Sequence, residues 1–485
     1  MKTLIQKLLT LVGGIVLVLL LIVFLSIGPL PWNNTSASFA DIDEHFRYGS
    51  IGGESTNGLP YWVWKVLPTM FADKLPGEGY QSLGFMQEPG RDLPIGFAKS
   101  KVNGLEVVTQ NCATCHVGQV RTSPNSKPLF VSTMPSHNVD LGGYIQFLRD
   151  VAVDPHFNAQ EMMPYIEASG ANLNPLEKLL YRFVAIPQTK DALMIQGNRL
   201  SFMDRQSPYG PGRVDTFTPY KTLRFNFPKD KLADSELQGI SDYPPVWKQR
   251  ARDGMQLHWD GNNDSVDERN KSAALALVQP TTINFASIHR VRDWLFDVPP
   301  PKYPFPIDAE LATQGKTLYE NSCASCHAFG GTKTGTIEPI AEIGTDRGRL
   351  DSYTPELAAN QYALFAGITY QGEDQRFTHF RKTDGYANLP LDGVWLRAPY
   401  LHNGSVPTLW DLLQKPSDRP TTFYRGNDLY VPDKVGFATD VAAENGKRYF
   451  PYDTRLPSNG NGGHLYGTEL SAADKKALLE YLKGI

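Results

Sequence analysis

The chain has 485 residues, a length that favours two domains over one compact core. Hydrophobic residues make up 41% and charged residues 20% of it, as in an ordinary globular protein, and the formal net charge of −4 argues against nucleic acid as a partner. Glycine (42 residues) and proline (36 residues) occur in many short clusters, which predicts helices joined by long irregular loops with little sheet.

The first predicted element is an apolar run from Leu8 to about Ile27, which follows Lys2 and Lys7. About 20 apolar residues can span a bilayer as a helix, whereas the apolar core of a cleaved signal peptide is usually about 7–15 residues long. The sequence therefore favours one transmembrane anchor within residues 1–30 over a cleaved signal. The positive-inside rule keeps both lysines in the cytoplasm. We expect a single-pass inner-membrane protein with the bulk of the chain in the periplasm.

All four cysteines of the chain belong to two C-x-x-C-H motifs, the haem c attachment pattern. The motifs consist of Cys112, Cys115 and His116, and of Cys323, Cys326 and His327. Two thiols on one helical turn can add to the vinyl groups of one porphyrin, and the next histidine then binds the iron as proximal ligand. A redox dithiol needs no such histidine, and a zinc site would need four ligands brought together. The motifs predict two covalent haem c groups, which fits an exported chain because haem c is attached outside the cytoplasm.

The first motif lies in a predicted N-terminal haem domain over residues 41–298, with a mostly helical insertion at about 155–250. A proline-rich linker at 299–306 separates it from a C-terminal cytochrome c domain over residues 301–485. Asp308 is a plausible N-cap for a helix that leads to the second motif, and an amphipathic helix follows Leu470 at the end of the chain.

A helix before C-x-x-C-H and a terminal helix that packs across it are typical of small class I cytochrome c domains. We therefore expect a mainly α fold. It would hold two class I cytochrome c-like haem domains with long loops, preceded by one N-terminal transmembrane helix.

Three further patches of the sequence resemble the bacterial di-haem cytochrome c peroxidase superfamily. Leu-His-Trp-Asp-Gly at 257–261 is similar to the family's F-W-D-G loop, and 397–409 is similar to its A-P-Y-x-H-x-G segment. The third patch, 463–468, precedes the last helix, where peroxidases place a methionine ligand. The chain looks closest to the di-haem rubber-oxygenase branch, in which a histidine takes that place.

The resemblance implies a set of axial ligands. His116 and His327 are the proximal ligands, and His464 is the sixth ligand of the second haem. His402 belongs to a haem-contacting loop and is the rival for that position. The oxygenase-like branch leaves the sixth position of the first haem open. His137, with Met134 nearby, is the alternative ligand there.

The resemblance also assigns Trp259, His258 and Arg269 to the catalytic centre, with Trp259 carrying an electron between the haems. A packed aromatic is the alternative for Trp259, and His258 and Asp260 would then only support it. Peroxidases follow W-D-G with a glutamine and an acid–base glutamate, whereas this chain offers Arg269 and Gln279, so no such glutamate is evident.

The sequence offers candidates for two kinds of additional contact around the haems. Haem propionates are candidate partners for arginines, because guanidinium groups bind carboxylates through paired hydrogen bonds. The candidates are Arg269, Arg290 and Arg292. Peroxidases also commonly hold one calcium ion between the domains, and 262–264 (Asn-Asn-Asp) is the only stretch that suggests it.

The sequence predicts an oxidoreductase with one electron-relay haem and one haem that reacts with hydrogen peroxide or dioxygen. Two haems with different axial ligands acquire different potentials, which suits this division. The expected redox partner is a small cytochrome or cupredoxin, and the N-terminal helix would contact the membrane. The alternative function is a non-catalytic di-haem electron-transfer protein of a respiratory chain.

Overall fold

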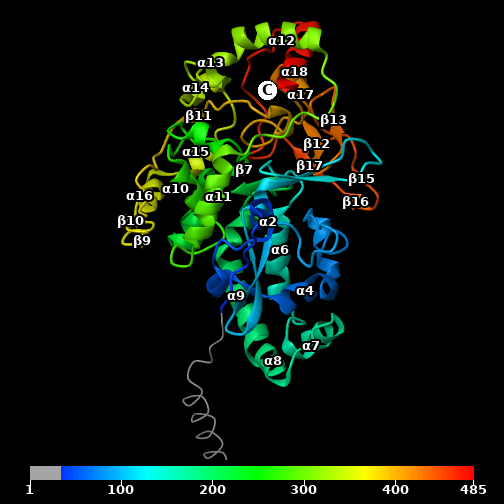
Figure 1. Cartoon of the computed structure of the whole chain (residues 1–485), viewed down its shortest axis with the longest axis vertical. Helices are drawn as coiled ribbons and strands as arrows, with labels where there is room; N and C mark the ends of the chain where they lie inside the picture. The colour runs from blue at the N-terminus through cyan, green and yellow to red at the C-terminus, as the bar shows by residue number, and fades with distance from the viewer. Residues whose placement is uncertain (1–33) are drawn as a thin grey trace, which may run out of the picture.

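The computed structural model describes residues 34–485 (Figure 1). The anchor predicted for residues 1–30 lies outside these residues. Across residues 34–485, no helix combines the length and the apolar character that crossing a membrane requires.

Short helices and short antiparallel strands alternate along the described chain. The α-helices are α2 (Ile42–Tyr48), α3 (Glu54–Asn57), α4 (Tyr61–Met70), α5 (Ala113–His116), α6 (Leu141–Ala152), α7 (Ala159–Ala168), α8 (Pro175–Leu180), α9 (Ile186–Arg199), α10 (Val266–Ala274), α11 (Phe285–Asp297), α12 (Ala309–Ser322), α13 (Ala324–His327), α14 (Ile340–Ile343), α15 (Gly348–Ser352), α16 (Pro355–Gln361), α17 (Leu409–Leu412) and α18 (Ala472–Lys483). Two π-helical turns, η3 (Tyr181–Ala185) and η5 (Tyr220–Arg224), accompany several 3₁₀ turns.

The strands form one three-stranded sheet and several two-stranded ones. The larger sheet has the order β1 (Leu59–Pro60), β3 (Leu105–Gln110), β2 (Phe97–Val102). The pairs are β4 (Val117–Val120) with β5 (Leu129–Ser132), β6 (Arg213–Asp215) with β7 (Ile240–Asp242), β8 (Ile337–Pro339) with β11 (Gly385–Ala387), β9 (Thr369–Tyr370) with β10 (Glu373–Asp374), β12 (Thr422–Arg425) with β17 (Phe450–Asp453), β13 (Tyr430–Val431) with β14 (Gly436–Phe437), and β15 (Ala443–Glu444) with β16 (Lys447–Arg448).

The expected mainly α fold is wrong, and the surroundings of the first motif show why. Strand β3 ends at Gln110, and β4 begins at Val117, directly after His116. The flanking segments are rich in valine and threonine, whose branched side chains favour strands over helices. No helix leads into Cys112, so the first motif does not have the class I layout.

The expected pair of separate class I haem domains is also wrong, because the two halves of the chain share their cores. One buried cluster joins Val120, Met134 and Trp247 to residues between 319 and 482. Another joins Phe217 and Leu275 to residues between 353 and 380. A further cluster, from Phe46 to Leu295, lies within the N-terminal half alone, but these two clusters draw on both halves and pack them against each other.

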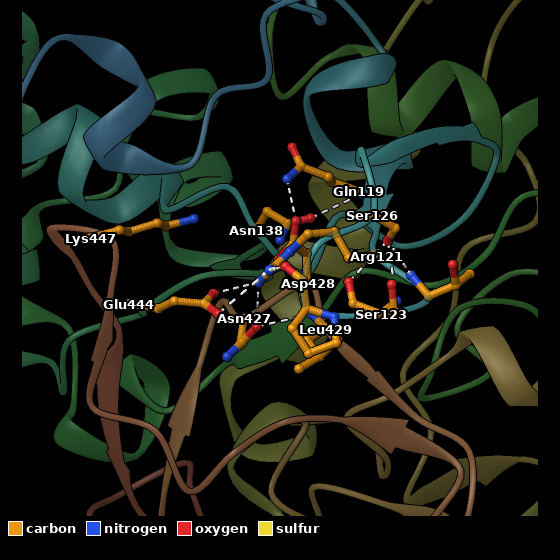
Figure 2. A network of polar contacts seen from close by, with 12 residues as sticks. Gln119, Arg121, Ser123, Ser126, Asn138, Asn427, Asp428, Leu429, Glu444 and Lys447 are labelled. Carbon is orange, nitrogen blue, oxygen red and sulfur yellow. Dashed lines mark hydrogen bonds and ion pairs between the residues drawn. The ribbon is translucent and has the colours of Figure 1, made fainter.

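A polar network strengthens this junction (Figure 2). Arg121, just after β4, pairs with Asp428 at 2.7 Å and also with Glu444 next to the β15–β16 turn. The backbone of Arg121 forms a parallel bridge with Leu429. The segment that follows the first motif is therefore fixed to the C-terminal half.

The C-terminal helices match the prediction. Asp308 caps α12 by accepting from the backbone N–H groups of Glu310 and Leu311, both at 3.0 Å. Helices α12 and α18 lie together at one end of the molecule (Figure 1). They pack closely at Gly315, because a Cβ atom at this position would lie only 1.9 Å from the Ala477 carbonyl oxygen. Helix α12 therefore delivers the second motif to a site that α18 borders.

The predicted insertion is helical only in its first part. Helices α7 to α9 occupy residues 159–199, at the end of the molecule opposite α12 (Figure 1). Short turns and the β6–β7 pair then occupy most of residues 200–250.

Candidate haem sites

The first motif forms the one-turn helix α5, which neighbouring polar groups hold in place. The Asn111 side chain donates to the Gly49 carbonyl at 2.8 Å and accepts from the Ala113 N–H at 3.0 Å. Nδ1 of His116 lies 3.0 Å from the Pro244 carbonyl oxygen, so Nδ1 carries the proton. This contact leaves Nε2 free as a metal ligand, the usual arrangement for an iron-binding imidazole.

The second motif repeats this arrangement on α13. Nδ1 of His327 donates to the Leu389 carbonyl oxygen at 2.8 Å, which again leaves Nε2 as the free ligand atom. Each of these histidines thus donates from Nδ1 to a backbone carbonyl and has Nε2 free. The donor set fits haem c at both motifs.

The thiols do not have the character of a redox dithiol. Burial raises the pKa of Cys112 and Cys323 to about 11 and that of Cys115 to about 12. Reactive cysteine pairs have lowered pKa values, because the thiolate is the nucleophile. The thioredoxin-like alternative therefore has no support at either motif.

His464 faces His327 across the second site. Their ring centres are 6.3 Å apart and their planes differ by 35°. Two imidazole nitrogens, each about 2 Å from one metal ion, place the ring centres about 6 Å apart. Burial, together with the nearby His327 and Arg419, lowers the pKa of His464 to about 4, so the ring is neutral and can donate to iron.

His402 is engaged elsewhere. Its Nε2 is 2.9 Å from the Tyr386 hydroxyl, and the two rings stack at 4.1 Å. The Tyr386 hydroxyl donates its proton to the Asp346 carbonyl at 2.6 Å, so it accepts from Nε2–H of His402. This contact argues against His402 as an iron ligand and leaves His464 as the candidate sixth ligand of the second haem.

No second imidazole stands opposite His116 in the described part of the chain. The aromatic neighbour of His116 is Tyr243, with ring centres 6.5 Å apart. His137 instead stacks on Phe437 at 3.7 Å, in a cavity with room for about one water molecule, and both of its ring nitrogens are buried without a partner. His137 thus does not pair with His116 as His464 does with His327.

The charge of Arg269 acts on both His116 and His258. Burial and then the charge of Arg269 lower the pKa of His116 to about 3 and that of His258 to about 4. Arg269 itself is 9% exposed, and burial lowers its pKa to about 10. Within residues 34–485 its guanidinium has no carboxylate partner, so it is available to an anion at this site.

Trp259 lies on the side of the second site. Its indole N–H donates to the Asp242 carbonyl at 2.8 Å, and its ring packs against Ile343 and Tyr386. The Ile343 carbonyl in turn accepts from the backbone N–H of His464 at 2.8 Å. The electron-carrying role of Trp259 stays a prediction.

Other candidate residues have structural partners. Arg292 pairs with Asp267 and Asp293 and is not free for a propionate, whereas Arg290 donates to the Ala40 carbonyl. In the 262–264 stretch, Asp264 pairs with His379 and Arg381. No group of three or more His, Cys, Asp or Glu residues in the described chain could hold a metal ion, and calcium has no support from this stretch.

Two residues with informative surroundings were missed by the sequence analysis. Glu268 precedes Arg269, but its carboxylate accepts from the backbone N–H groups of Thr378 and His379 at 2.6 and 3.0 Å, so it serves as a structural clamp. The spacing Ser265–Glu268 is a helix-start signature and could have placed it on the first turn of α10. Arg419, which contacts the His464 loop, has no motif that marks it.

Comparisons with known proteins agree with this picture. The family model described as "Cytochrome c" matches residues 312–378, which contain the second motif, and the model "RoxA-like, cytochrome c-like" matches residues 385–424. The uncharacterized protein y4iJ of Sinorhizobium fredii (strain NBRC 101917 / NGR234) is 30% identical over 557 residues, covering 89% of each chain. The chain belongs to the family of y4iJ.

A second relative from the same organism, the uncharacterized protein y4iM, is 34% identical over 254 residues. That match covers 46% of this chain, and the chain spans 57% of the length of y4iM. The two family models make the protein a haem c redox protein. Membership of the peroxidase superfamily and the number of haems stay predictions.

Proposed function

We propose that the protein is a di-haem c-type oxidoreductase that works outside the cytoplasm. One haem, between His327 and His464, would relay electrons, and the other, on His116, would meet hydrogen peroxide or dioxygen. The observation that carries this proposal is the asymmetry of the two sites. An imidazole stands 6.3 Å from His327, ring centre to ring centre, and none stands opposite His116 in residues 34–485.

The second site favours electron transfer alone. His327 and His464 would occupy both axial positions, so a small oxidant would find no place on the iron. Two imidazoles donate strongly to ferric iron and lower the potential relative to a histidine–methionine pair.

The first site has the groups that reactive chemistry needs. Haem c supplies one-electron chemistry there and binds small oxidants when one axial position is open. Arg269 would donate charge-assisted hydrogen bonds to the oxygen atoms of the bound oxidant. His258 is neutral and its Nδ1–H donates to the Asn262 side-chain oxygen, which leaves Nε2 to accept a proton.

A small electron-transfer protein is the proposed partner. Three large apolar side chains are exposed beside the ligands of the second site: Phe329 (45% exposed), Leu465 (60%) and Tyr466 (42%). Phe329 follows His327 closely, and Leu465 and Tyr466 follow His464 directly. Exposed apolar residues next to a buried redox centre suit brief docking of a small cytochrome or cupredoxin.

The ferric spectrum of the purified holoprotein tests the proposal. We expect a high-spin signal from one haem that changes on addition of peroxide, or of dioxygen after reduction. Two low-spin haems that ignore both oxidants would instead identify a non-catalytic electron-transfer protein. The location is tested by a C-terminal fusion to a reporter that is active only outside the cytoplasm.

A further inference from the structure

Arg419 is a buried arginine whose partners are all backbone carbonyl groups. It is 3% exposed, and burial lowers its pKa to about 10. Its guanidinium donates to five carbonyl oxygens, those of Leu412 (3.2 Å), Gln414 (3.1 Å), Asn461 (2.6 Å), Gly463 (2.9 Å) and His464 (3.2 Å). A buried guanidinium whose N–H groups all donate to backbone carbonyls fixes the geometry of the segments that carry these carbonyls. We call the Arg419 guanidinium with these five hydrogen bonds the Arg419 fork.

The five carbonyls come from two segments. Leu412 and Gln414 belong to the end of α17, where a helix leaves carbonyl groups unpaired. Asn461, Gly463 and His464 belong to the loop that carries the proposed sixth ligand. Arg419 therefore ties this loop to a helix end.

Other contacts hold the part of the loop before His464: the Asn403 side chain donates to the Gly460 carbonyl at 2.9 Å, and the Asn461 side chain donates to the Pro420 carbonyl at 3.1 Å. The backbone N–H of His464 bonds to the Ile343 carbonyl, while its ring Nδ1 is buried without a partner in the described chain. His464 has φ +48°, a conformation that a non-glycine residue rarely adopts unless its surroundings impose it. Arg419 binds the His464 carbonyl directly and the Gly463 carbonyl before it, so it is one of the groups that impose this conformation.

We infer that Arg419 is the positioning residue that holds His464 on the iron of the second haem and so closes that haem to small ligands. This inference rests on the proposed function, in which His327 and His464 are the two axial ligands. Without the fork, the loop would leave the helix end, and His464 would dissociate for part of the time. The second haem would then become an additional open site.

The test uses the full holoprotein and compares Arg419→Ala, Arg419→Lys and Arg224→Ala. Arg224 is the matched control, because its partly buried guanidinium also donates only to backbone carbonyls, those of Leu275 and Val278. The readouts are the low-spin signal of each ferric haem and the rate of carbon monoxide binding to each ferrous haem.

We expect Arg419→Ala to raise the rate of carbon monoxide binding at the second haem about a hundredfold, because about three hydrogen bonds to the loop are lost. Arg419→Lys, with at most three donors, should give about a tenfold rise. Arg224→Ala should lower the denaturation midpoint and leave the second haem low-spin and closed. If Arg419→Ala does not accumulate as holoprotein, the lysine variant carries the test.

His464→Ala separates failure of the inference from failure of the proposed function. If His464→Ala leaves the second haem low-spin, the assigned axial pair is wrong. If His464→Ala opens the second haem, but every Arg419 variant that folds keeps it low-spin and closed, the role of Arg419 is overturned. The assignment of His327 and His464 as axial ligands is then retained.

Discussion

The imidazole rings of His327 and His464 face each other with centres 6.3 Å apart, although the two residues lie far apart in the sequence. Their separation matches what two nitrogens on one iron require. His464→Ala should therefore convert one haem to high spin while both covalent attachments survive. His464→Met should restore a low-spin haem at higher potential, because a thioether donates less strongly than an imidazole.

His402→Ala is the control for that prediction. The ring of His402 is bonded to the Tyr386 hydroxyl, so its loss should leave both spin states unchanged. If His402→Ala converts the second haem to high spin and His464→Ala does not, the ligand is His402.

Cys112→Ala combined with Cys115→Ala should remove the first covalent haem and leave the second. Haem staining under denaturing conditions should fall from two haems per chain to one, and the paired change at Cys323 and Cys326 should have the same effect. Two haems per chain in either double variant would show that attachment does not follow the motifs.

Arg269→Ala should slow the reaction with peroxide or dioxygen about a hundredfold, as the loss of a charged hydrogen-bond donor at a reacting oxygen does. Arg269→Lys should recover part of the rate. Arg292→Ala is the control, because Arg292 pairs with Asp267 and Asp293. An unchanged rate in Arg269→Ala would remove Arg269 from the reactive site.

Arg349→Ala should destabilise the protein by about 3–5 kcal/mol, because it leaves a buried carboxylate without its partner. Arg349 pairs with Asp260 at 2.8 Å, and both side chains are buried. Urea unfolding of the holoprotein measures the loss. A cost below about 1 kcal/mol would show that the pair resembles an exposed salt bridge.

The network of Figure 2 predicts a pH effect. The hydrogen bond from Arg121 holds the pKa of Glu444 below its ordinary value of 4.5. Because the folded-state pKa is depressed, the ion pair contributes stability above pH 4.5, and this contribution is lost as the pH falls through the folded value. Below this pH, the free energy of unfolding should therefore fall less steeply with decreasing pH in Glu444→Gln than in the wild type. If the free energy of unfolding falls equally steeply with decreasing pH in both proteins, the prediction is contradicted.

The sequence predicted the parts of the molecule that local patterns encode. The two haem motifs, the Asp308 cap and the terminal helix each follow from a few neighbouring residues. The strands around the first motif were missed because glycine and proline clusters were interpreted as loops. The buried clusters shared by both halves and the contacts of Arg419 could not be predicted from the sequence. Arg419 binds backbone carbonyls between residues 412 and 464, and such contacts leave no side-chain pattern.

Cyanide titration of the purified ferric holoprotein tests the central claim, one closed haem and one open haem, most directly. Optical spectra report how many haems per chain bind cyanide. The account predicts that one of the two binds it, and that His464→Ala raises the number to two. Cyanide binding at both haems of the wild-type protein, or at neither, would contradict the account.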